Sequence, residues 1–282
     1  MSEDLGKEMA IEAAKAVAVE GYKDTLQPTL KAVGSVIALP FQAIDAALSK
    51  PKLWVAEKHY NYERTRQLLA EKLQYTPEEL IVPPENYVAV PALQQIAYCF
   101  DSDELRDMYA NLLANSMNMV VKNGVHPGFV EIIKQLSPDE AKIIRYLSVQ
   151  NRIPTLGLKI DKADSSHIVY VKEFSNVPEL SMCENTYDSQ KYFDNLVRLG
   201  LVERSPDGTY ISNENEYETL KKHPFIKNKY QNIEKQSATI DNFSKIDYIK
   251  GYCELTAFGK SFCSICLETQ KVFIINSQES GN

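Results

Sequence analysis

Cysteine and histidine are the residue types in this chain whose spacing could bind a metal ion. Cys263 and Cys266 form a Cys-x-x-Cys pair, and Cys253 and His223 could complete the four ligands of a structural zinc site. The sequence has no second Cys-x-x-Cys pair, and residues 257–268 have a helical pattern in which positions three apart share one buried face. The sequence therefore favours buried, reduced thiols over a metal site, and we expect no cofactor.

A second candidate is a lysine-rich stretch in the C-terminal third of the chain. Residues 218–250 include seven Lys against two Glu and two Asp. A loop of this kind could contact the phosphates of a nucleic acid without reading its bases. A solvated surface loop is the alternative, because one cluster of Lys neutralises few phosphates. The lysines that lie among aromatic residues are Lys221, Lys222, Lys227 and Lys229.

Residues typical of catalysis do not form a recognised motif in this sequence. The sequence contains no Ser-His-Asp motif, His-Glu-x-x-His motif, P-loop or Gly-rich dinucleotide fingerprint. The acids between Asp101 and Asp107 fall in the first turn of a predicted helix, where the helix dipole favours negative charge. We therefore expect a protein that is not an enzyme. The four histidines are scattered at His59, His126, His167 and His223.

Composition places the chain among ordinary globular proteins. Its 282 residues are enough for one large or two ordinary domains, with 44% hydrophobic and 24% charged residues. Residues 1–150 carry 15 Lys and Arg against 20 Asp and Glu, and residues 151–282 carry 16 against 18. Neither half is basic, which argues against broad nucleic-acid binding. Five cysteines, the lack of a secretory signal and the lack of a long apolar run predict a cytoplasmic protein with reduced thiols.

The clearest structural elements lie in the middle of the chain, where residues 85–150 predict three successive amphipathic helices. The first starts at Asp101, with Glu104 at the spacing of a capping box. The second has Pro127 at its first position, and the third opens with Ser137-Pro138-Asp139-Glu140, a cap followed by Pro and Glu. The buried face of the first helix is predicted at Leu105, Met108, Tyr109, Leu112, Leu113 and Ser116.

The same stretch resembles a known protein family. The matching segments are Tyr87-Val-Ala-Val-Pro91-Ala-Leu, Asp103-Glu-Leu-Arg-Asp-Met-Tyr109-Ala-Asn-Leu-Leu113-Ala and His126-Pro-Gly-Phe129-Val-Glu-Ile-Ile133-Lys-Gln-Leu-Ser137-Pro-Asp-Glu140. They are similar to the bacterial abortive-infection alpha family. The similarity extends upstream to Gln27-Pro28, Gly34, Pro40 and Trp54, and it weakens after residue 200. The resemblance implies a role in phage defence, and it supplies no catalytic residues.

The N-terminal 84 residues predict a helical arm whose most apolar part is residues 26–48. These helices could lie on a membrane or pack as a buried hairpin. Lys31 is the only Lys or Arg within residues 26–48, and Gly34 and Ala38 permit close approach of another helix. These features favour packing on protein, within the chain or in a homo-oligomer. The residues that would contact protein or lipid are Leu30, Val33, Gly34, Ile37 and Phe41.

The C-terminal half has the pattern of a small α+β domain. Residues 153–158 and 168–171 read as strands, and a helix around 192–197 ends at Gly200. Residues 201–204 and 209–212 read as a strand pair, and Thr256 caps a final helix. This order resembles the winged-helix domain. It departs from the winged-helix pattern in a long insert near residues 213–251.

Together these patterns predict a mainly α fold in three parts. An N-terminal helical arm (1–84) and a middle helical bundle (85–136) precede a winged-helix-like α+β domain (137–282). We expect a non-enzymatic phage-defence protein that acts through contacts with a protein partner or with further copies of itself. Two alternatives remain open: a winged-helix DNA-binding regulator, and an effector that acts on membranes through residues 26–48.

Overall fold

The computed structural model describes residues 59–96, 99, 102–206, 209–211 and 213–268. The predicted N-terminal arm therefore lies mostly outside the described residues, and so do all five of its candidate contact residues. The elements follow in the order α4 (His59–Leu73), η2 (Glu78–Leu80), α5 (Asn86–Ile96), α6 (Asp103–Ser116), η3 (Lys122–Gly124), α7 (Gly128–Lys134), α8 (Pro138–Gln150), β1 (Arg152–Lys162), β2 (His167–Val171), α9 (Val177–Leu180), α10 (Ser189–Arg198), β3 (Val202–Arg204), α11 (Glu214–Lys222), α12 (Pro224–Gln236), η4 (Ser237–Thr239), β4 (Phe243–Leu255) and α13 (Ala257–Cys266).

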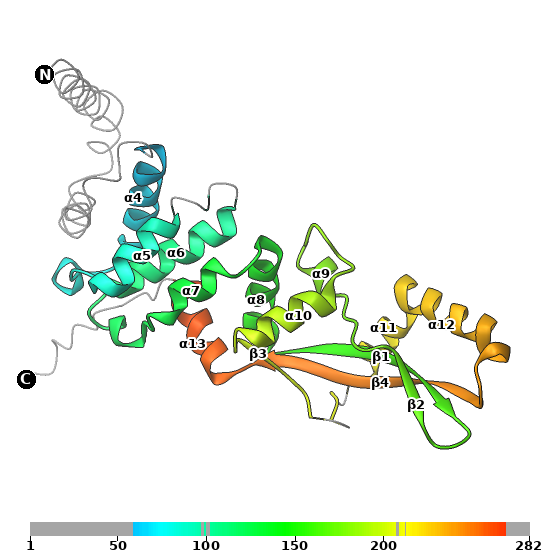
Figure 1. Cartoon of the computed structure of the whole chain (residues 1–282). Helices are drawn as coiled ribbons and strands as arrows, with labels where there is room; N and C mark the ends of the chain where they lie inside the picture. The colour runs from blue at the N-terminus through cyan, green and yellow to red at the C-terminus, as the bar shows by residue number, and fades with distance from the viewer. Residues whose placement is uncertain (1–58, 97–98, 100–101, 207–208, 212, 269–282) are drawn as a thin grey trace, which may run out of the picture.

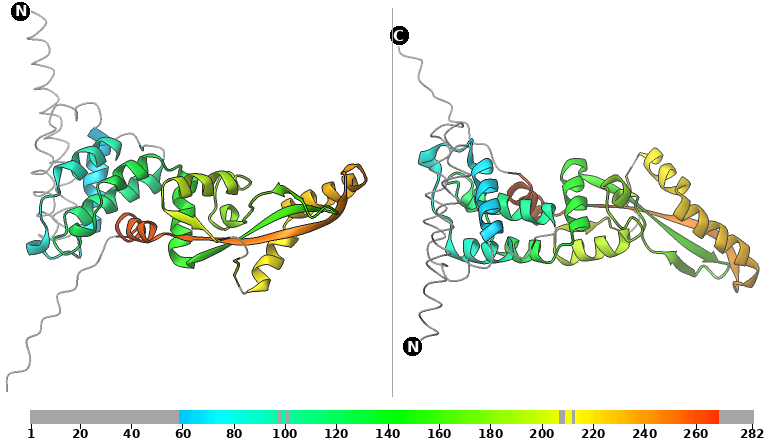
Figure 2. Two further views of the ribbon diagram at one scale, coloured as in Figure 1. Left: turned by 60° about the horizontal axis from the view of Figure 1, so that its bottom comes forward. Right: turned by 90° about the horizontal axis from the view of Figure 1, so that it is seen from above.

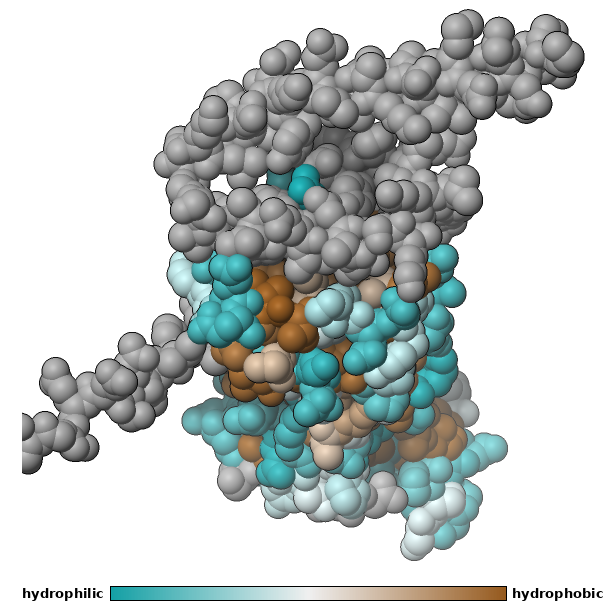
Figure 3. Space-filling view, turned by 90° about the vertical axis from the view of Figure 1, so that its left-hand side faces the viewer, coloured by the Kyte–Doolittle hydropathy of each residue, from teal (hydrophilic) through white to brown (hydrophobic). Residues whose placement is uncertain are grey.

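The described chain is mainly helical and elongated (Figure 1). A helical bundle of α4 to α7 and α13 occupies one end, and α8 and α10 lie next to it. The sheet extends away from the bundle, and α11 and α12 cover one of its faces near the far end (Figure 2). Seen from the bundle end, the described surface shows apolar side chains grouped among polar ones (Figure 3).

Helix α6 is the centre of the bundle. Leu112 and Leu113 are 0% and 2% exposed, which confirms the predicted buried face. Neighbouring helices cover the other sides of α6 as well, so that Asn111 and Asn115 are also buried. Their side-chain amides donate to the backbone carbonyls of Cys266 and Ile265. These bonds satisfy the last turn of α13 and fix the C-terminal helix to the middle of the chain.

The helix starts in the structure match the predicted ones or differ from them by one residue. The N-cap of α6 is Ser102 and not Asp101: its hydroxyl accepts from the N–H of Leu105. Helix α7 begins one residue after Pro127, and α8 has the predicted capping box between Ser137 and Glu140. An additional helix, α5, precedes α6. The prediction of three helices over residues 85–150 was therefore one short, because Pro91 in the interior of α5 weakens the helical pattern.

The four strands form one antiparallel sheet in the order β2-β1-β4-β3. Strands β1 and β4 pair along their whole length, from Arg152 with Glu254 to Lys162 with Phe243. The predicted strands at 153–158 and 168–171 are confirmed as parts of β1 and β2. The predicted pairing of 201–204 with 209–212 was wrong, because β3 takes β4 as its partner and residues 209–211 form no strand.

The long insert near 213–251 is not the irregular loop that its polar composition suggested. It forms α11, α12, η4 and the first part of β4. Residues at helical spacing on α11 and α12 are buried against the sheet, where they make a second core cluster separate from that of the bundle. Burial of this apolar face stabilises the helices despite their many charges. The cluster is built from Tyr217, Leu220, Ile226 and Ile233 on the helices and from Leu156, Leu158, Ile160, Val171 and Phe174 beside them.

Candidate functional site

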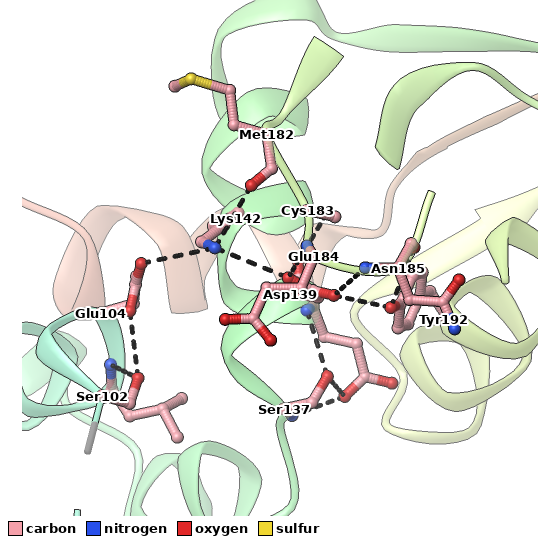
Figure 4. A network of polar contacts seen from close by, with 12 residues as sticks. Ser102, Glu104, Ser137, Asp139, Lys142, Met182, Cys183, Glu184, Asn185 and Tyr192 are labelled. Carbon is pink, nitrogen blue, oxygen red and sulfur yellow. Dashed lines mark hydrogen bonds and ion pairs between the residues drawn. The ribbon is translucent and has the colours of Figure 1, made fainter. Parts of the chain in front are cut away.

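A polar cleft of about 830 Å³ lies between the first turn of α6, the start of α8 and the loop that leads into α10 (Figure 4). Six carboxylates line it and outnumber three lysines, so its formal charge is negative. The acids are Asp103, Glu104, Asp139, Glu140, Glu184 and Asp188, and the lysines are Lys134, Lys142 and Lys191.

Asp139 is the most constrained acid of the cleft. Its carboxylate accepts hydrogen bonds from the N–H of Glu184 (2.9 Å), the N–H of Asn185 (3.2 Å) and the hydroxyl of Tyr192 (2.7 Å). Burial acts to raise the pKa of Asp139, but these three bonds and the charge of Lys142 lower the pKa below its usual value. Asp139 therefore stays ionised at neutral pH and ties the 184–185 loop and α10 to the start of α8.

Glu140 has a similar structural role on the other side of the helix start. One oxygen accepts from the N–H and hydroxyl of Ser137, which completes the capping box. The other oxygen accepts from the side-chain amide of Asn195 at 2.8 Å. The Asn195 amide also reaches the carbonyl of Gln135. Glu140 thus connects the start of α8 with α10 as well as completing the cap of α8.

Lys142 provides the positive charge on the α8 side of the cleft. Its ammonium group lies 3.6 Å from Asp139 and 3.8 Å from Glu104, and it donates to the carbonyl of Met182. It therefore links α6, α8 and the segment that follows α9 (Figure 4). Because the carboxylates that line the cleft outnumber its lysines, the cleft keeps an excess of negative charge after Lys142 is paired.

Cys183 and Tyr192, which both contact Asp139, hold their protons at neutral pH. Burial, the charge of Asp139 and a hydrogen bond with its side chain raise the pKa of Cys183 to about 12. Burial and the bond to Asp139 also raise the pKa of Tyr192 above its usual range. A thiol nucleophile requires a lowered pKa. The geometry thus suits the binding of a positively charged group better than attack by Cys183.

The four candidate metal ligands lie in different surroundings. Cys263 and Cys266 face the bundle core on α13, while the Cys253 thiol contacts Glu173. Burial raises the pKa of Cys263 to about 12 and that of Cys266 well above its usual value. His223 caps α12 and contacts Glu179 at 2.9 Å. Within the described residues, no three His, Cys, Asp or Glu side chains lie close enough together to hold a metal ion.

The four candidate nucleic-acid lysines lie on α11 and α12. Lys221 pairs with Glu218 at 2.7 Å and lies over the ring of Tyr248. Lys229 lies over the rings of Phe225 and Tyr170. Lys222 and Lys227 are exposed, and neither forms an ion pair with a described residue. Lys221 and Lys229 therefore make contacts within the chain, whereas Lys222 and Lys227 are exposed.

The sequence identified only part of the cleft. Ser137 and Glu140 were predicted as a cap, but nothing indicated that Asp139 bonds to Tyr192, which lies 53 residues further along the chain. Lys142 and Asn195 were likewise not singled out, because a polar residue on a helix face carries no periodic signal. The available signal was the Ser-Pro-Asp-Glu start, which places two carboxylates at one helix N-terminus.

Comparisons with known proteins now bear on this fold and cleft. No curated protein matches the chain. A solved structure of an uncharacterized protein from the hydrocarbon-degrading marine bacterium Alcanivorax borkumensis SK2 is 18% identical and covers 49% of this chain and 90% of that chain. Its TM-score is 0.35, a similarity that adds nothing to the fold described above. A family model described as "Abortive infection alpha" matches residues 57–266. Because this match spans most of the sequence, the chain belongs to the abortive infection alpha family.

Proposed function

We propose that this protein acts in phage defence by binding another protein at the polar cleft, and not by catalysis. Family membership supports a defence role in general. The proposal rests mainly on the hydrogen bonds of Asp139 and Glu140. Their carboxylate oxygens hold the 184–185 loop and α10 against α8. A cleft fixed in this way presents a preformed surface, which lowers the entropic cost of binding.

The chemistry of the cleft indicates the kind of partner. Asp139 and Glu140 are buried and committed to bonds within the chain, whereas Glu184 is exposed and Asp188 is half-buried. Carboxylates on the rim of an interface attract complementary charge and speed association. We therefore propose a partner that presents Lys or Arg side chains to Glu184 and Asp188.

Phage challenge of cells that express charge-reversal variants tests this proposal. Glu184→Lys reverses an exposed charge on the cleft without removing the bond from its backbone N–H to Asp139. We expect this variant to fold normally and to lose protection against phage. Glu203→Lys is the matched control, because Glu203 is exposed on β3, outside the cleft. Equal protection by both variants at equal protein levels would reject the cleft as the contact surface.

A second candidate function, DNA binding, is supported by the order of the C-terminal elements. The chain runs α8, β1, α9, α10, β3 and β4, and β4 lies between β1 and β3. This connectivity resembles the winged-helix domain, with β2, α11 and α12 as additions. The helix that would face DNA is α10. Its outward side is mixed in charge, since Asp194 pairs with Arg204 and Lys191 lies near Asp188, so any binding should be weak.

Fluorescence anisotropy with duplex DNA at several salt concentrations tests the second candidate. We expect weak binding that falls steeply with salt and disappears when Lys221, Lys222, Lys227 and Lys229 are all replaced by Ala. The loss should be equal for all sequences, because contacts between Lys and phosphate carry no base information. Lys260→Ala on α13 is the single-lysine control. Tight binding to one duplex that survives the fourfold replacement would instead favour a sequence-specific regulator.

A further inference from the structure

An apolar segment follows the last described residue, Glu268. Residues 272–275 are Val, Phe, Ile and Ile, and they lie between Lys271 and Asn276. β-Branched and aromatic residues favour extended backbone. A short segment of this kind, without Pro or Gly, is prone to self-association when it is exposed to water. Burial against the folded part of the same chain removes its apolar surface from water.

The position at which this segment leaves the folded chain is fixed by α6. The side-chain amide of Asn115 donates to the carbonyls of Ile265 at 2.7 Å and Glu268 at 2.8 Å. The last turn of α13 also lies beside η3, because a Cβ on Gly124 would be 3.5 Å from the side chain of Ile265. The chain therefore leaves α13 next to the carboxyl end of α6 and the loop that follows it.

The loop after α6 presents apolar side chains near this point. Met119 and Val120 are 47% and 56% exposed. The N–H of Met119 donates to the carbonyl of Leu80 at 2.9 Å, so the backbone of the loop is held against the segment that precedes α5. Exposed apolar side chains on a fixed backbone form a docking surface that loses little conformational freedom on binding.

Asn118 in the same loop is a buried donor without an acceptor among the described residues. Its side-chain oxygen accepts from the N–H of Val120 at 3.0 Å, which fixes the orientation of the amide. Asn118 is 0% exposed, and no described group accepts a hydrogen bond from its Nδ2 atom. A buried donor left unpaired costs free energy, so we expect an acceptor from outside the described residues. A backbone carbonyl of an extended segment is such an acceptor.

We propose that residues 272–275 dock on the surface formed by Asn118, Met119 and Val120 of the same chain. Their apolar side chains cover Met119 and Val120, and one of their backbone carbonyls accepts from the Asn118 amide. The segment thereby ties the end of α13 to the end of α6. This contact is separate from the polar cleft, which α6 lines with residues of its first turn.

The short connection selects this occupant over a partner protein or a second copy. Glu268 is bonded to Asn115, and the N–H of Asn118 donates to the carbonyl of Asn115 at 3.2 Å. The docking surface therefore begins within one turn of the point where the chain leaves α13. Residues 269–272 span up to about 14 Å when extended, which is long enough to reach it. A segment tethered this closely has a far higher effective concentration than a separate molecule.

Hydrogen–deuterium exchange of the full chain tests the proposal. Relative to an unstructured chain, we expect the amides of residues 272–275 to exchange at least about tenfold more slowly than those of residues 277–282. Val120→Asp should abolish this protection, because it places a charge against apolar side chains. Val149→Asp on α8 is the matched control, since Val149 is 73% exposed and the same change there should leave the protection intact. Equal exchange of the two segments, or protection that survives Val120→Asp, overturns the proposal.

Cross-linking distinguishes docking within one chain from exchange of segments between copies. In the double variant Val120→Cys, Ile274→Cys, a short bismaleimide should join the two new thiols and give a product of monomer mass. The native chain is the blank for its own thiols, four of which are buried. The pair Val149→Cys, Ile274→Cys is the matched control and should not be joined. A product of dimer mass, or no product, overturns docking within the chain.

Discussion

Replacement of Asp139 by Ala tests the view that this carboxylate holds α8, α10 and the intervening loop together. The change removes the acceptor of three hydrogen bonds, from the N–H groups of Glu184 and Asn185 and from the hydroxyl of Tyr192. The Tyr192 hydroxyl keeps one further contact, with the carbonyl of Asn185 at 3.2 Å. Asp139 is 8% exposed, so water cannot readily take the place of the carboxylate.

The expected loss follows from these bonds. A hydrogen bond to a charged group contributes about 1.5–3 kcal/mol, but the two loop amides can partly turn to solvent when Asp139 is absent. We therefore expect Asp139→Ala to lower the free energy of unfolding by about 2–4 kcal/mol. Tyr192→Phe removes only the 2.7 Å bond and should cost about 1–2 kcal/mol. The double variant should lose less than the two single losses combined, because both changes remove the same bond.

The pH dependence provides an independent check on the charge of Asp139. Its pKa in the folded protein is lowered from 3.8, because the hydrogen bonds and Lys142 outweigh the effect of burial. A lowered folded-state pKa means that the stabilisation is fully present above the unfolded pKa and is lost as the pH falls through the folded pKa. The difference in stability between native protein and Asp139→Ala should therefore shrink as the pH falls below about 4.

Urea unfolding at a series of pH values measures both effects. Asp241→Asn serves as the control, because Asp241 is exposed and removing its charge should leave stability unchanged. The reasoning is refuted if Asp139→Ala is as stable as the native protein at neutral pH. It is also refuted if the difference between them stays constant down to pH values at which free carboxylates are protonated.

Three further predictions concern the core, a close helix contact and the N-terminal arm. Leu112→Ala should lower the free energy of unfolding by about 2–5 kcal/mol, because Leu112 is fully buried in the bundle; an unchanged thermal midpoint would contradict the assignment. Gly259→Ala should lower the thermal midpoint, because an added Cβ would lie 2.0 Å from the carbonyl oxygen of Leu201; calorimetry that finds no change would show that α13 can shift. In the arm, Gly34→Leu should reduce oligomer mass or stability by light scattering if those helices pack on protein. Liposome flotation that is strong for the native protein and lost with Ile37→Asp would instead favour a membrane effector.

The local starts and stops of helices could be predicted from the sequence because they depend on neighbouring residues. Ser137 and Glu140 cap α8 as expected, and Thr256 caps α13 through a bond to the N–H of Gly259. Gly200 ends the segment after α10 with a φ of 72°, a conformation that glycine adopts without strain. Periodicity within a few turns likewise led to the buried face of α6.

Predictions failed where pairing over a long distance decided the structure. Residues 209–211 have the composition of a strand but have no strand beside them, because β4 already occupies the edge of β3. The insert was expected to be a loop, yet burial of Ile226 and Ile233 against the sheet makes it helical. Propensity within a segment is a weak preference that tertiary contacts override.

The sequence by itself determined the family, the mainly helical class and the start of α8. Only the tertiary structure decided that Asp139 meets Tyr192, that Asn111 and Asn115 hold the end of α13, and that β2 is an edge strand of the sheet that the described residues form. The physical reason is that caps and periodic apolar faces are encoded within a few residues. A cleft or an edge instead arises from groups far apart in the chain that become neighbours only when the cores form.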